Sequence, residues 1–123
     1  MRFCIAPEVF EKWPEYRRYT VVGKGLNNAG DDPALLALLR EAELEVRNDP
    51  GLENYKEYPP IASWRSVFRD MGLNPNKFPP SIANLIRRTR SGKDLPFINR
   101  TVAIMNIISL KYHVPCGGDD LAE

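Results

Sequence analysis

The sequence predicts an α+β domain in which two short N-terminal strands precede about four helices. Large apolar residues at 1, 3 and 5 alternate with Arg2, Cys4 and Ala6, and β-forming residues fill 19–22. Four later segments instead carry apolar residues at helical spacing. Proline supplies 11 of the 123 residues, twice the usual ~5%, which favours short helices joined by stiff turns.

Length and composition indicate a single domain over residues 1–123. The hydrophobic fraction of 43% and the charged fraction of 27% are typical of a globular protein. The chain has seventeen Lys and Arg residues and sixteen Asp and Glu residues, so its formal net charge is only +1. Any site for a polyanion therefore has to be local. No apolar run approaches the ~20 residues that a membrane-spanning helix needs. We therefore expect no contact with a membrane, and two lone cysteines without a signal peptide suggest reduced thiols in the cytoplasm.

Start and stop signals delimit the expected helices. Asp31 or Asp32 can cap the first, with Pro33 at its first position. The second covers 59–71 and stops at Gly72, and the third is expected to begin with Ser81 as its cap and to end at Gly92. The fourth contains the apolar run 102–110.

A polar stripe crosses that fourth helix. At about 100° per residue, Asn106, Ser109 and His113 fall near Asn99 on one face, which Ala103 and Leu110 complete. Buried amides and hydroxyls require hydrogen-bond partners. One interpretation is that Asn99 caps the helix and Asn106 fixes a neighbouring loop; the other is that the stripe lines a ligand pocket.

Basic residues gather on the second and third helices. Arg65 and Arg69 lie on the second, and Arg87, Arg88, Arg90 and Lys93 close the third. Cations near helix C-termini are favoured electrostatically, which suggests a solvated face, whereas a phosphate-contacting patch is the functional alternative.

No catalytic constellation, metal site or cofactor motif emerges. The chain has one histidine and two cysteines, Cys4 and Cys116, at opposite ends and without zinc-ligand spacing. Gly23 and Gly25 lack the third glycine and the helix of a dinucleotide fingerprint. We expect no metal, no cofactor and no catalytic residue that the patterns identify.

The segment from residue 61 to 121 resembles the B3/B4 editing domain of the phenylalanyl-tRNA synthetase beta subunit, and more closely the free-standing proteins built on that domain. The opening 28 residues also fit the start of that family. The matching positions are Trp64-Arg65, Gly72, Asn74-Pro75, Ser81, Leu85, Arg87-Arg88, Leu95-Pro96, Ile98-Asn99, Asn106, Ser109-Leu110, Pro115, Gly117-Gly118 and Asp120-Leu121.

The resemblance implies trans-editing hydrolysis of a mischarged aminoacyl-tRNA. Asn99, Asn106 and Ser109 would then position the substrate, and Arg65, Arg87 and Arg88 would contact RNA. Ala83 and Ala103 stand where the family usually carries Glu and Asp. The alternative is therefore a non-catalytic module that binds an amino acid or tRNA.

The resemblance also predicts an associating partner. Family members continue past this point into a strand-rich half, so we expect a domain that is incomplete at its C-terminus. Apolar faces of the helices would then stay uncovered. We expect a homo-oligomer, or a second chain that supplies the missing half. The residues assigned to these faces are Leu35, Leu39, Trp64, Phe68, Leu85, Ile86, Ile104 and Ile108.

Overall fold

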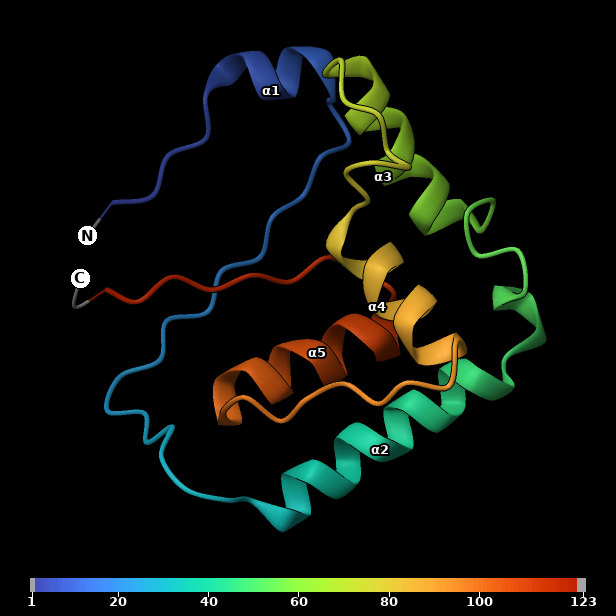
Figure 1. The fold of residues 1–123 in the computed structure, drawn as a ribbon. Helices are drawn as coiled ribbons and strands as arrows, with labels where there is room; N and C mark the ends of the chain where they lie inside the picture. The colour runs from blue at the N-terminus through green and yellow to red at the C-terminus, as the bar shows by residue number, and fades with distance from the viewer. Residues whose placement is uncertain (1, 122–123) are drawn as a thin grey trace.

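The structure, a computed structural model, describes residues 2–121, and these form an all-α fold (Figure 1). The helices are α1 Pro7–Lys12, α2 Pro33–Asn48, α3 Pro59–Asp70, α4 Ser81–Arg90 and α5 Arg100–Tyr112, with a short 3-10 turn, η1, at Pro50–Leu52. The four helices that the sequence predicts are confirmed as α2 to α5. The α+β class is wrong, because no strand forms within residues 2–121.

Both predicted strands lack a partner. Residues 2–6 and 19–22 have no regular secondary structure, and Met1 lies outside the described residues. A β-strand is stable only beside another strand that shares its backbone hydrogen bonds. The described chain offers neither segment such a neighbour. Pro7 instead opens α1, a helix that the sequence analysis did not predict.

Local capping explains where α2 and α5 begin. The Asp32 side chain accepts a hydrogen bond from the Leu35 amide at 3.0 Å, and the Asn99 side chain accepts one from the Val102 amide at 2.8 Å. Each satisfies a backbone donor that the first helical turn leaves unpaired. The expectation that Ser81 caps α4 is wrong: Pro80 holds that position, and Ser81 is the first helical residue.

Glycines end two of the helices as predicted. Gly72 and Gly92 follow α3 and α4 with φ of 79° and 83°. This left-handed backbone is open to glycine at little cost. The chain can therefore reverse direction sharply at the end of both helices.

The core lies where α2, α4 and α5 meet. α2 and α5 pack side by side, and α4 contacts both of them (Figure 1). α3 and η1 add Ile61 and Leu52 to the same apolar cluster. Its fully buried side chains are Leu39, Leu52, Ile61, Ile82, Ile86 and Leu110.

A buried carboxylate joins α2 to the connection before α5. Glu43 is fully buried, and its carboxylate accepts hydrogen bonds from the Leu95 amide and the Arg40 guanidinium. Arg40 also donates to the Leu95 carbonyl at 2.9 Å. A buried carboxylate is tolerated only when it is paired and hydrogen-bonded. These bonds therefore fix residues 91–99 against α2.

Arginines also join the C-terminal ends of α2 and α4. Arg47 of α2 donates to the Thr89 carbonyl of α4 at 3.0 Å, while Arg90 of α4 donates to the Val46 carbonyl of α2 at 3.0 Å. Carbonyl groups in the last turn of a helix have no partner within that helix, and cations are favoured there. The two helices thus cap each other.

Asp94 completes this network. The hydrogen bond from Arg47 holds the pKa of the Asp94 carboxyl below its ordinary value of 3.8. The stabilisation from this pair is therefore present above that value and is lost as the pH falls through the lowered pKa.

The N-terminal part of the chain reaches the core through side-chain contacts. Lys12 donates to the Asp70 carbonyl at the end of α3, 3.0 Å away, and the Tyr16 ring packs edge-on against Trp64. Residues 17–31 then run as an extended trace from α1 to α2 (Figure 1). Arg100 of α5 anchors the far end of this trace by donating to the carbonyls of Asn27, Ala29 and Asp31.

Candidate nucleic-acid interface

The polar stripe of α5 faces inward. Ala103, Ser109 and Leu110 are buried, whereas Ile104 and Ile108 on the outer face are 47% and 40% exposed. Asn99 is committed to its cap, and the Ser109 hydroxyl donates to the Val114 carbonyl. Two of the three expected substrate-binding side chains thus hold the backbone at either end of the helix.

Asn106 is the member of the stripe that keeps a ligand-binding capacity. It is half-buried, and within residues 2–121 its amide makes no hydrogen bond to protein. His113, by contrast, ends α5 in a left-handed conformation, and its Nδ1 lies 3.2 Å from the Tyr58 hydroxyl. The histidine therefore fixes the end of α5 against the start of α3.

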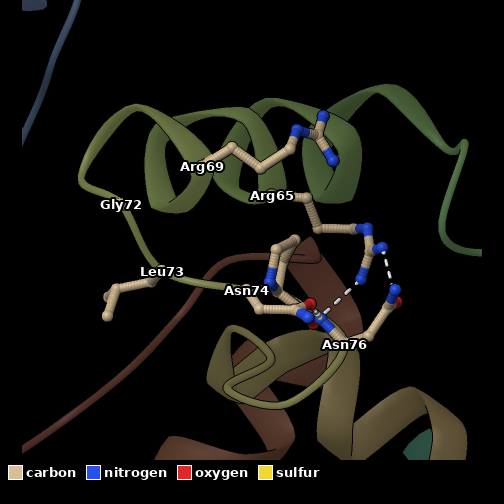
Figure 2. A pocket seen from close by; sticks show the side chains of 7 residues that line it. Arg65, Arg69, Gly72, Leu73, Asn74 and Asn76 are labelled. Atoms are coloured by element: carbon tan, nitrogen blue, oxygen red, sulfur yellow. Dashed lines mark hydrogen bonds between the residues drawn. The ribbon is translucent and has the colours of Figure 1, made fainter.

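Arg65 is buried under the turn that follows α3. Its Nη1 donates to the Pro75 carbonyl at 3.1 Å and its Nη2 to the Asn76 side chain at 2.9 Å. Figure 2 shows the guanidinium directed at Asn76, and Leu73 also lines the cavity beside this turn. Because both bonds run to the turn, Arg65 sets the position of residues 73–77 and contributes its charge to the wall that they form.

Two hollows lie on either side of this turn and share Arg65, Pro75 and Asn76 as a wall. The first, of about 400 Å³, extends to Arg69 and Gly72, and the second has about 460 Å³. We call the two hollows together the basic groove. The second hollow is lined by Tyr55, Lys56, Arg65, Pro75, Asn76, Lys77, Pro79, Ala83, Asn84 and Arg87.

The lining of the basic groove is cationic. Arg69, Lys56, Lys77 and Arg87 join Arg65, and among the described residues no carboxylate lines either hollow. The amide of Asn84 orients Arg87, which donates to it at 2.7 Å. Guanidinium and ammonium groups held beside neutral amide donors suit the oxygens of phosphates.

The predicted basic patch is thus divided in space. Arg65 and Arg87 lie in the groove, but Arg88 donates to the Asp94 carbonyl at 3.2 Å and Arg90 caps α2. Arg88 thus contacts the connection between α4 and α5, and Arg90 contacts the end of α2. Helical spacing places Arg87 and Arg88 about 100° apart, but only the position of the connection decides which of them lies in the groove.

Sequence reasoning missed Lys56 and Lys77. Lys56 lies between η1 and α3, and Lys77 lies between α3 and α4. Neither falls on a periodic element, so no pattern in the sequence predicts that they meet.

The two alanines that replace the family's carboxylates lie in different places. Ala83, where the resemblance implies a Glu, lines the second hollow, whereas Ala103 is buried on the inner face of α5. Ala83 therefore leaves the groove without a negative charge at that point.

Other reactive groups lie apart from the groove. Cys4 and Cys116 are both free thiols, and burial raises the pKa of the Cys116 thiol above its ordinary 9.0. Within residues 2–121 no cluster of three or more His, Cys, Asp or Glu side chains could hold a metal ion. No helix in the same range is long and apolar enough to cross a membrane.

Comparisons with protein-family models, curated proteins and solved structures found no match to this chain.

The two arginines of the first hollow allow a direct test of this geometry. Arg65→Ala removes two hydrogen bonds and leaves the Pro75 carbonyl without its partner, so we expect a loss of about 2–3 kcal/mol in the free energy of unfolding. Arg69→Ala removes an exposed cation of equal charge and should change stability by less than ~0.5 kcal/mol. Urea unfolding measures both, and equal losses would contradict the structural role of Arg65.

Proposed function

We propose that this chain is a tRNA-binding module related to the editing domains of phenylalanyl-tRNA synthetases, and that it contacts RNA through the basic groove. The observation that carries the proposal is the set of five cations, Lys56, Arg65, Arg69, Lys77 and Arg87, along two adjoining hollows without a carboxylate. The sequence resemblance of residues 61–121 to the editing domain is the reason for proposing tRNA as the RNA that binds.

Charge supports a local interface for RNA. The formal net charge of the whole chain is only +1, so general attraction to polyanions is weak. Phosphate contacts by Lys and Arg position a protein on nucleic acid and carry little sequence information. The groove therefore accounts for affinity, while the choice of tRNA requires further contacts.

Trans-editing hydrolysis is the second candidate, and Asn106 favours it. A half-buried amide without a protein partner can orient a water molecule or an ester carbonyl. However, Asn106 does not line the basic groove, and Asn99 and Ser109 are occupied by backbone groups. Binding without turnover therefore ranks above hydrolysis.

The exposed outer face of α5 also supports association with another copy or another chain. Ile104 and Ile108 stay accessible there, whereas Leu39 and Ile86, from the same predicted apolar set, are buried in the core.

The salt dependence of tRNA binding tests the groove. Lys77→Ala combined with Arg87→Ala removes two phosphate contacts, so the slope of log affinity against log salt should flatten by about 1.4–1.8. Arg88→Ala combined with Lys93→Ala removes the same charge outside the groove and serves as the matched control. Filter binding of unfractionated tRNA at several salt concentrations measures the slopes, and equal slopes for the two double variants would contradict the proposal.

Deacylation separates the two candidate functions. With tRNAs mischarged with several amino acids, we expect binding but no ester hydrolysis above the spontaneous rate, because only one amide of the stripe is available. Turnover that exceeds the spontaneous rate and disappears in Asn106→Ala would instead establish hydrolysis. Lys111→Ala, on the exposed surface of the same helix, controls for general effects on α5.

A further inference from the structure

Residues 17–26 leave their whole backbone unpaired. Within the described chain, none of their N–H or C=O groups takes part in a hydrogen bond, although the flanking turn at 13–16 and the loop at 27–31 are both bonded. All ten residues are exposed, so water can satisfy these groups, and a partner strand could replace that water with its own backbone. Here they are open to another chain.

The side chains of this segment suit a β-strand. Residues 19–22 read Tyr-Thr-Val-Val, and residues of these types are enriched in strands. Tyr19 and Val21 are 91% and 94% exposed, so these two side chains pack against little of the described chain. Gly25, with φ of 65°, limits the regular stretch at its C-terminal side.

Both ends of the segment are anchored. The Arg18 guanidinium lies over the Phe3 ring, 3.9 Å from its centroid, and the Arg100 contacts with residues 27–31 hold the other end. A segment that is already extended and tethered loses less conformational entropy when it pairs with a partner. The fold therefore holds these residues extended and accessible to a partner, because both ends of the segment are tethered.

Charge indicates which partner fits. The segment contains Arg17, Arg18 and Lys24 and no carboxylate. The nearest one, Glu15, lies 3.9 Å from Arg17 in an exposed pair, which is weak and can be exchanged for a partner's carboxylate. Opposite charges across paired strands are stabilising, and like charges are destabilising. Two copies of the segment would also form only a two-stranded pair, which is marginal in water, whereas a third strand added to an existing sheet is more stable.

We propose that residues 17–22 add as a strand to the exposed sheet edge of a partner protein, and that carboxylates on that edge face Arg17 and Arg18. This is strand addition, in which main-chain hydrogen bonds supply affinity and side chains supply selectivity. The surface is separate from the basic groove, so the proposal does not rest on RNA binding.

The test uses two cyclic β-hairpin peptides as probes. The free edge of one carries two adjacent glutamates among valines, so that one glutamate lies on each face of the strand as Arg17 and Arg18 do, and that of the other carries two adjacent lysines in their place. Amide exchange of residues 17–22 in the full chain is followed by NMR. We expect the glutamate hairpin to slow the paired amides about tenfold and the lysine hairpin to leave them unchanged. The Arg17→Glu variant should abolish this preference, because Arg18 keeps its contact with Phe3, and its thermal unfolding should match the wild type because the Arg17 side chain is exposed.

Each other outcome overturns the proposal. Exchange that neither hairpin slows would exclude strand addition at this segment. Equal slowing by both hairpins would exclude selection by charge. Exchange that slows with protein concentration alone would identify a second copy as the partner. Loss of tRNA binding in the groove variants leaves all these readings unchanged, so the two proposals fail independently.

Discussion

The buried carboxylate of Glu43 is the constraint on which the rest of the fold depends. An unpaired charge in the core costs several kcal/mol. The face of α2 that carries Glu43 can therefore be buried only if the carboxylate keeps its partners. One partner, Arg40, lies on the same helix, and the other is the backbone of Leu95. This pairing brings the connection between α4 and α5 to one place on α2. It buries the Leu95 side chain in the core and sets where Asn99 can start α5.

The same requirement determines how the arginines are used. Arg40 and Arg47 share the carboxylates of Glu43 and Asp94 at one end of the helical core, and Arg90 is occupied by carbonyls of α2. The cations around the turn after α3 have no carboxylate in either hollow. A chain with a net charge of only +1 thus has a cationic groove, because no carboxylate of the described residues lines either hollow, while Glu43 and Asp94 pair with Arg40 and Arg47 elsewhere.

Much of the helical structure could be predicted because its signals are local. The caps at Asp32 and Asn99 act within three residues, and apolar spacing identifies the buried face of each helix. The strands could not be excluded in this way, since the β-propensity of residues 19–22 says nothing about whether a neighbouring strand exists. Of the basic patch, Arg65 and Arg87 lie in the groove, but Lys56 and Lys77 reach it from loops whose positions depend on tertiary contacts such as the Arg65 bonds.

The free energy of unfolding of Glu43→Ala tests the central claim most directly. If the carboxylate fixes the connection against α2, its removal leaves Arg40 and the Leu95 amide without their buried partner, and we predict a loss of about 3–5 kcal/mol in urea unfolding. Glu41→Ala, an exposed position on the same helix, should change stability by less than ~0.5 kcal/mol. A loss in Glu43→Ala no larger than that of Glu41→Ala would contradict this account of the fold.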